Sequence, residues 1–184
     1  MGRRPVGRAR LGDGVVCRPI RQLHWSGGDD PDQKGNIAET AIALAALKLG
    51  LGVYRPVMEG QRYDLIINTG ERLLRVQCKW AARDGDVLLV RCCSARRSLG
   101  GRVVNRYYTS TEVDAFAAYS SDLDRCFLLP PKLWERRRLL HLRISPTRNS
   151  QVRGINWASD YEFGATLQSF GAVAQLGERR AGSA

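Results

Sequence analysis

Three short segments rich in strand-forming residues follow one another closely in this sequence, at residues 53–57, 62–67 and 73–80. Valine, isoleucine and leucine dominate them, with the alternation typical of strands. Asn68-Thr69-Gly70-Glu71, which has the composition of a tight turn, joins the second segment to the third. The three segments are therefore predicted to form an antiparallel meander.

One amphipathic helix is expected directly before the meander, beginning at Gln33. Gly50 and Gly52 supply its end. Its apolar residues recur at steps of three and four, as one face of a helix requires, at Ile37, Ala41, Leu44, Ala45 and Leu47.

The segment after the meander predicts both strands and helices. Thr109 and Glu112 stand at the spacing of a capping box, which predicts a second helix ending before Asp122. The Gly- and Arg-rich stretch before it, through Arg106, is expected to be a mobile loop. Further strands are expected at 86–92, 125–129 and 139–144, and a tail helix at 155–163. This order predicts an α/β fold, a mixed sheet with helices packed on it.

The balance of charge points to nucleic acid as the partner. The 184 residues suffice for one domain, and 43% hydrophobic with 26% charged residues is an ordinary globular mixture that excludes wholesale disorder. Lys and Arg number 29 against 18 Asp and Glu, a net charge of +11. Most of the cations are arginines, which favour bidentate contacts with phosphate.

The sequence also indicates the compartment. No apolar run approaches the ~20 residues that span a bilayer, and the basic N-terminus lacks the apolar segment of a signal peptide. The five cysteines form no C-x-x-C pair and are predicted to be reduced thiols. We therefore expect a cytoplasmic protein without a membrane partner.

Four polar residues form the candidate catalytic cluster: Glu39, Asp64, Gln77 and Lys79. Side chains alternate along a strand, so Gln77 and Lys79 share a face, and the hairpin can bring Asp64 beside them. Glu39 lies in the middle of the helix and either faces solvent or reaches over the sheet toward the same place. Phosphodiester hydrolysis uses such a set, with carboxylates that hold Mg²⁺ and a lysine that orients the attacking water.

These motifs resemble the PD-(D/E)xK nuclease superfamily, in the variant with Gln at the acidic position. The motifs are Glu39, then Tyr63-Asp64-Leu65-Ile66-Ile67, then Val76-Gln77-Cys78-Lys79-Trp80. They are most similar to those of the group I intron homing endonucleases, whose site is a helix Glu, a strand Asp and a Gln-x-Lys. The likeness continues through residues 111–119, 127–130 and 148–151. The literal Pro-Asp dipeptide is missing, since Pro56 stands at the end of the first strand.

The resemblance implies a restriction-endonuclease-like core of order α-β-β-β-α-β. It implies catalysis by Glu39, Asp64, Gln77 and Lys79, and a Mg²⁺ site, with Mn²⁺ as a substitute, at Glu39, Asp64 and the backbone carbonyl of Cys78. It also implies a homodimer or homotetramer, because two strand cuts need two sites. The nuclease domain is then residues 33–165, between a basic flexible arm at 1–32 and a C-terminal tail at 166–184.

Arginines near the predicted active strands suit a clamp on the backbone of double-stranded DNA: Arg83, Arg91, Arg96, Arg97, Arg102 and Arg106. Asn149 and Gln151 could contact adenine edges in the major groove.

The sequence therefore predicts a metal-dependent DNA endonuclease, a sequence-specific homing enzyme of the group I intron type. Two alternatives stay open at this point. One is a structure-selective nuclease, such as a Holliday junction resolvase or a repair nuclease, which would use the same site. The other is a basic nucleic-acid-binding protein without catalysis.

Overall fold

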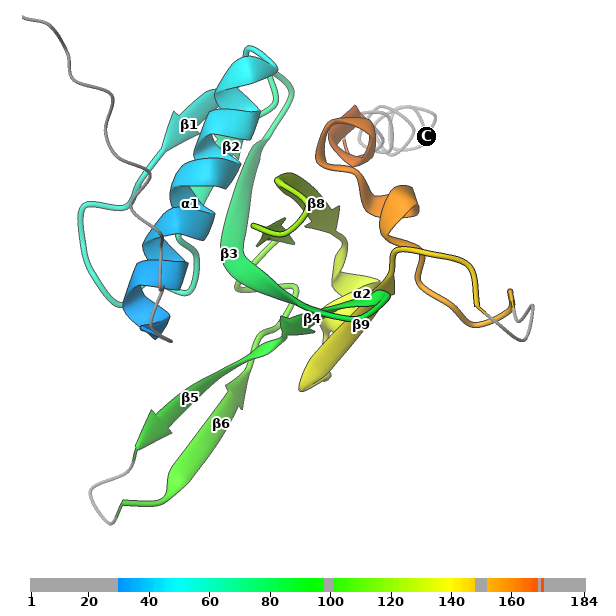
Figure 1. Ribbon diagram of the computed structural model, residues 1–184. Coiled ribbons are helices and arrows are strands. Elements are labelled where there is room, and N and C mark those ends of the chain that lie inside the picture. The colour runs from blue at the N-terminus through cyan, green and yellow to red at the C-terminus, as the bar shows by residue number, and fades with distance from the viewer. Residues whose placement is uncertain (1–29, 98–100, 148–151, 169, 171–184) are drawn as a thin grey trace, which may run out of the picture.

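The computed structural model describes residues 30–97, 101–147, 152–168 and 170 (Figure 1). The basic arm before residue 30 and the two polar residues Asn149 and Gln151 lie outside them. The elements run in the order α1 Pro31–Lys48, β1 Gly52–Tyr54, β2 Leu65–Asn68, β3 Leu73–Asp84, β4 Val87–Arg91, β5 Cys93–Arg97, β6 Val103–Tyr107, β7 Ala115–Ser120, β8 Arg125–Leu129, α2 Pro131–Trp134, β9 Leu139–Arg143 and the 3₁₀ turn η1 Ala158–Tyr161.

Strand β3 lies at the centre of a seven-stranded mixed sheet. Its beginning pairs antiparallel with β2, and β1 pairs with β2, so the predicted meander is confirmed. Its middle pairs in parallel with β7, which continues to β8, and its end pairs with β4, which continues to β9. β5 and β6 form a separate two-stranded ribbon that extends away from the sheet in Figure 1.

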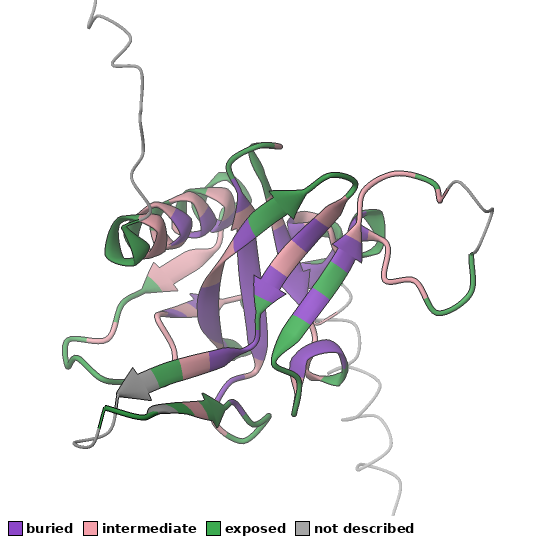
Figure 2. Cartoon of the chain, turned by 60° about the horizontal axis from the view of Figure 1, so that its bottom comes forward, coloured by how far each residue is buried: buried purple, intermediate pink, exposed green. Residues whose placement is uncertain are grey.

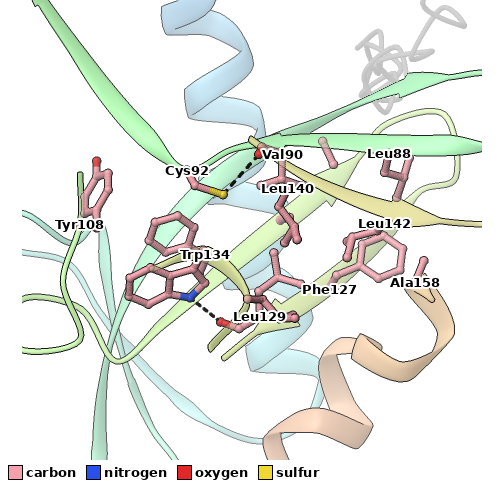
Figure 3. Packing of buried hydrophobic residues seen from close by; sticks show 14 of the residues in the cluster. Leu88, Val90, Cys92, Tyr108, Phe127, Leu129, Trp134, Leu140, Leu142 and Ala158 are labelled. Carbon is pink, nitrogen blue, oxygen red and sulfur yellow. Dashed lines mark hydrogen bonds between the residues drawn. The ribbon is translucent and has the colours of Figure 1, made fainter. Parts of the chain in front are cut away.

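The alternation of side chains along β3 divides the core into two clusters. Leu74, Val76 and Cys78 pack against α1, together with Ala115 and Ala117 of β7. The opposite face of the sheet packs under α2, where the Trp134 ring stacks on Phe116 with centroids 4.3 Å apart and its indole Nε1 donates to the Leu129 carbonyl at 2.9 Å (Figure 3). Figure 2 shows buried positions, in purple, along the strands of the sheet and on α1.

Helix α1 begins two residues earlier than expected, because Asp30 caps it. The Asp30 carboxylate accepts a hydrogen bond from the Asp32 N–H at 3.1 Å, and Pro31 occupies the first turn, where no N–H is needed. The end at Gly50 agrees with its positive φ of 76°. The fully buried residues are Ala38, Ile42 and Ala46, whereas the expected face residues Leu44 and Leu47 are exposed.

The predicted second helix is wrong. The capping contact exists, since the Thr109 N–H donates to the Glu112 carboxylate at 3.3 Å, but it closes only a turn. The next residues form strand β7, which is central and therefore buried on both faces. A strand buried on both faces needs a continuous run of apolar residues, and Ala115-Phe116-Ala117-Ala118 is such a run. A continuous apolar run has no periodicity, so its sequence alone does not distinguish a strand from a helix.

Two other expectations need correction. The loop expected through Arg106 is in fact the ribbon of β5 and β6, with Ala95 opposite Asn105. The tail helix expected at 155–163 is replaced by the short turn η1, and helical residues follow at 163–168. The strands expected at 86–92, 125–129 and 139–144 are confirmed as β4, β8 and β9.

Two predictions about the chain's environment can be compared with the described residues. No helix in this part of the chain has the length and apolar character needed to cross a membrane. The four cysteines within it, Cys78, Cys92, Cys93 and Cys126, are all free thiols.

The stacked tryptophan supplies a test of the core. Trp134→Ala should lower the free energy of unfolding by about 3–5 kcal/mol, the usual cost of removing a fully buried large aromatic side chain. Val57→Ala is the control, because Val57 is fully exposed and its truncation should change stability by less than ~0.5 kcal/mol. Urea unfolding curves of both variants measure the difference, and equal midpoints would contradict this packing.

Candidate active site

The candidate site lies where β2 begins, beside the middle of β3. Asp64 directly precedes β2, and its backbone N–H donates to the Val76 carbonyl at 2.9 Å. One oxygen of its carboxylate, Oδ2, accepts a hydrogen bond from the amide Nε2 of Gln77 and another from the backbone N–H of Cys78 at 2.7 Å. The Asp64 side chain thus replaces a strand as the partner of the Cys78 N–H.

The backbone carbonyl of Cys78 belongs to the same cluster. The Gln77 Nε2 that contacts Asp64 also donates to this carbonyl oxygen, at 3.3 Å. The thiol of Cys78 points instead into the core under α1, where burial raises its pKa well above the usual range. The carbonyl oxygen is therefore the group that Cys78 can offer to a ligand, and the thiol is not.

Burial sets the electrostatics of Asp64. Desolvation raises the pKa of its carboxyl, although the Cys78 N–H, the Lys79 ammonium and the Gln77 amide all act in the opposite direction. The anion is therefore only partly compensated by its neighbours. A further cation beside it would lower the free energy of the ionised site.

Glu39 settles one alternative that the sequence left open. It lies on α1, and with Asp64 it lines one hollow of about 430 Å³. Its pKa is raised by burial first and by the charge of Asp64 second, and the Arg55 guanidinium lowers it from 3.3 Å away. The side chain therefore reaches toward the Asp64 site. Pro56, the proline displaced from the expected dipeptide, lines the same hollow.

Lys79 shares the β3 face of Gln77, and its half-buried side chain lies among aromatic rings. Its ammonium nitrogen is 3.4 Å from the Tyr108 hydroxyl, 4.8 Å from the centroid of the Tyr108 ring and 5.5 Å from that of Phe116. Within the described part of the chain it forms no salt bridge with a carboxylate. Aromatic faces and one hydroxyl thus hold this cation.

The structure connects the four predicted residues through Asp64, beside the middle of β3. Asp64 contacts Gln77, shares a hollow with Glu39 and lies within reach of the charge of Lys79. Sequence reasoning missed Arg55, Arg62 and Tyr108. Arg55 directly follows β1 and pairs with Glu39 on α1. Its positive charge, a short distance along the chain from the helix that carries Glu39, was the only sequence feature that indicated this contact. Tyr108 lies 29 residues from Lys79, and only the parallel pairing of β3 with β7 brings that part of the chain back to it.

No group of three His, Cys, Asp or Glu side chains in the described ranges could hold a metal ion. The carboxylates that line the hollow are those of Glu39, Glu59 and Asp64. A cation there would need the Cys78 carbonyl and non-protein ligands as well.

The predicted DNA-contacting residues are spread over two regions. Arg83 and Arg91 lie exposed at the ends of β3 and β4, and the Arg83 Nε donates to the Gly85 carbonyl at 2.9 Å. The others lie on the ribbon, where Arg106 pairs with Glu112 at 2.7 Å. Those on the ribbon or at its edge are Arg96, Arg97, Arg102 and Arg106.

Comparison with known proteins agrees with this geometry. None of the proteins with curated functions matches the sequence. Among solved structures, the bacterial homing endonuclease I-Ssp6803I matches with a TM-score of 0.64 and 25% sequence identity, over 78% of this chain and 97% of that one.

The family assignment comes from the sequence profile. The family model of PD-(D/E)XK endonucleases matches residues 29–164, which include α1, the whole sheet and all four residues of the candidate cluster. The mixed α/β core, with the helix Glu, the strand Asp and the Gln-x-Lys on the next strand, agrees with it. This chain is therefore a nuclease that belongs to the PD-(D/E)XK endonuclease family.

Proposed function

We propose that this chain is a metal-dependent endonuclease that hydrolyses phosphodiester bonds in double-stranded DNA. The observation that carries the proposal is the convergence of the Asp64 carboxylate, the Gln77 amide and the Cys78 backbone, with Lys79 next on the strand. Three of these groups are held by hydrogen bonds to one another, so the arrangement is preorganised. An ordinary polar strand face has no need of a half-buried, desolvated carboxylate near a lysine.

The donors at this place fit a hard divalent cation, Mg²⁺ in our proposal, with Mn²⁺ as a substitute. Burial raises the pKa of both Glu39 and Asp64, and the charge of Asp64 adds to the shift of Glu39, so the pair is short of positive charge. Both described hydrogen bonds to the Asp64 side chain end on Oδ2, which leaves Oδ1 for a cation. When bound, the ion supplies Lewis-acid stabilisation of the charge that develops on the phosphate.

The protein side chains have separate roles in this proposal. Gln77 and the Cys78 N–H fix the orientation of the Asp64 carboxylate. Lys79 places a compact ammonium group beside the attacking water and the developing negative charge. Glu39 and the Cys78 carbonyl oxygen complete the set of protein oxygens. Arg55 offsets part of the Glu39 charge from the side of the hollow.

The ribbon of β5 and β6 is the proposed DNA-contacting element. A two-stranded ribbon has the dimensions to enter a major groove about 12 Å wide. Its arginines would contact phosphates, together with Arg83 and Arg91 on the body of the protein. Asn149 and Gln151 remain candidates for contacts with bases.

We further propose a sequence-specific homing role of the group I intron type. The support is the likeness to I-Ssp6803I, a bacterial homing endonuclease, across nearly the whole of that chain. A homodimer or homotetramer follows from the need to cut two strands with two sites. The catalytic domain would be residues 33–165, acting in the cytoplasm. The alternative functions are Holliday junction resolution and DNA repair cleavage, and the experiments below compare the homing role with them.

The first test separates these possibilities. Purified protein should cleave supercoiled plasmid DNA with Mg²⁺ and should be inactive with Ca²⁺ or EDTA, and Asp64→Asn should lower cleavage by at least ~100-fold while DNA affinity stays within about twofold. Asp122→Asn, an exposed carboxylate on a turn, is the matched control. A synthetic four-way junction is assayed in parallel, and preference for it would favour junction resolution over homing.

The same variant tests the metal site without any cleavage. Mg²⁺ should raise the thermal midpoint of the wild type and of Asp122→Asn, and should leave Asp64→Asn unchanged. Since burial raises the pKa of Asp64, its protonated form persists to higher pH than that of an ordinary aspartate. Protons compete with the ion for the carboxylate, so the Mg²⁺ effect should disappear as the pH falls through this raised pKa. Equal Mg²⁺ stabilisation of Asp64→Asn would contradict the assignment.

Substitutions of Lys79 and of Gln77 should affect cleavage in different ways. Lys79→Ala should cut the single-turnover rate by about 100-fold or more while leaving DNA and metal binding in place, and Lys79→Arg should fail as well, because a planar fork cannot replace a compact ammonium. Gln77→Glu should keep part of the activity, since it restores the commoner acidic ligand, whereas Gln77→Ala should lose most of it. Single-turnover rates at saturating enzyme decide this, and a wild-type rate for Lys79→Ala would exclude its catalytic role.

The ribbon is tested by the salt dependence of DNA binding. Removing Arg96 and Arg97 together should flatten the plot of log affinity against log salt by about 0.9 for each phosphate that the variant no longer neutralises. The control is Arg72→Ala with Lys132→Ala, which removes the same charge from residues lining a different hollow, with Asp160 and Tyr161. The same change of slope in both double variants would show a non-specific effect of net charge.

A further inference from the structure

Tyr108 occupies an unusual place directly after the ribbon. Its side chain is buried, and its ring contacts two cations, the Arg62 guanidinium at 3.7 Å from the ring centroid and the Lys79 ammonium at 4.8 Å. The Phe116 ring packs edge-on against it, with centroids 5.2 Å apart. Figure 3 shows Tyr108 at the margin of the cluster that contains Trp134. Packing alone does not require a tyrosine at this position, because a phenylalanine would fill nearly the same volume. The hydroxyl group of Tyr108 therefore has a role beyond packing.

The Tyr108 hydroxyl has a defined partner. It lies 3.4 Å from the Lys79 ammonium nitrogen, which forms no salt bridge within the described part of the chain. A lysine side chain has several rotatable bonds and loses considerable entropy when it is fixed. The rings of Tyr108 and Phe116 limit the space that Lys79 can sample, and the hydroxyl gives its ammonium group one direction.

Arg62 in turn fixes Tyr108 and the base of the ribbon. Its Nη2 donates to the Tyr107 carbonyl at 2.9 Å, its Nη1 donates to the Ser94 hydroxyl at 3.3 Å, and its Nε lies 3.3 Å from a Glu112 carboxylate oxygen. Ser94 belongs to β5 and Tyr107 to β6, so one guanidinium holds both strands. Because Arg62 is only two residues before Asp64, the ribbon and the candidate site share this anchor.

We propose that Tyr108 is a positioning residue that holds the Lys79 ammonium group at the reaction centre. The role rests on the proposed function, in which Lys79 acts on the attacking water. Tyr108 itself contacts neither substrate nor metal in this arrangement. It acts through Lys79, by excluding alternative rotamers and by orienting one N–H bond, while Arg62 stacks on its ring and keeps it in place.

The kinetic test compares three variants on the supercoiled plasmid with Mg²⁺. Tyr108→Phe should lower the single-turnover rate about tenfold, the size of one hydrogen bond to a charged group, and Tyr108→Leu about 100-fold, because the ammonium is then displaced. DNA affinity should stay within about twofold in both. Tyr161→Phe is the control, since it removes a tyrosine hydroxyl on η1, in the separate hollow lined by Arg72 and Lys132, and should leave the rate unchanged.

A second measurement follows Lys79 directly and needs no cleavage. The chain has four lysines, Lys34, Lys48, Lys79 and Lys132, so ¹³C-lysine labelling gives four ε-methylene signals by NMR. The Lys79 signal, identified by its loss in Lys79→Arg, should be shifted upfield by the nearby rings in the wild type. It should move toward the ordinary lysine position in Tyr108→Leu, with the other three signals unchanged as a check of folding.

The outcomes separate the two proposals. A wild-type protein that cleaves no DNA would overturn the proposed function. In an active enzyme, a wild-type rate for Tyr108→Phe, or a Lys79 signal unmoved by Tyr108→Leu, would overturn the positioning role alone. A reduced rate for Tyr108→Phe with weakened DNA affinity of the same size would overturn it as well, since the defect would then lie in binding.

Discussion

The hydrogen bonding of β3 on both of its edges is the constraint on which the rest of this structure depends. β2 and β7 flank its first part, and the chain returns to form the parallel β7 pair only after β4, β5 and β6. This pairing buries β7 from Ala115 to Ala118 and the middle of β3 from Val76 to Cys78, and the continuous burial of β7 requires small or apolar side chains there. It also places Gln77 and Lys79 on a fixed backbone, so their spacing follows from the pleat of the strand and not from a loop.

The candidate site is an electrostatic compromise within this sheet. The apolar packing that stabilises β3 also removes water from Asp64, and desolvation outweighs the hydrogen bonds and positive charges that favour its anion. Arg55 and Lys79 reduce the imbalance without removing it. A half-buried carboxylate that the protein leaves under-compensated destabilises the fold slightly, and such sites are characteristic of places that bind a ligand of opposite charge.

The local parts of the fold were predictable from the sequence, and the long-range parts were not. The antiparallel meander and the helix before it depend on turn residues and periodicity within a few positions of each other. β7 could not be distinguished from a helix, because Ala115 to Ala118 suits both and only its burial between β3 and β8 decides. For the site, the two strand motifs were visible because Asp64 and Gln77 are hairpin neighbours. Arg62 and Tyr108 were missed because their contacts join residues at least 29 positions apart.

The ribbon has a consequence for how such a protein can change over evolutionary time. Strands β5 and β6 pair with each other and leave the sheet, and the ribbon residues of described burial at 94, 95, 101, 102 and 104–107 all lie outside the buried core. Substitutions at the exposed positions among them therefore alter the surface at almost no cost to folding. Substitutions there can accumulate while the residues of the sheet stay the same. Sequence differences among proteins descended from this chain should therefore be more frequent in the ribbon than in β3 and β7.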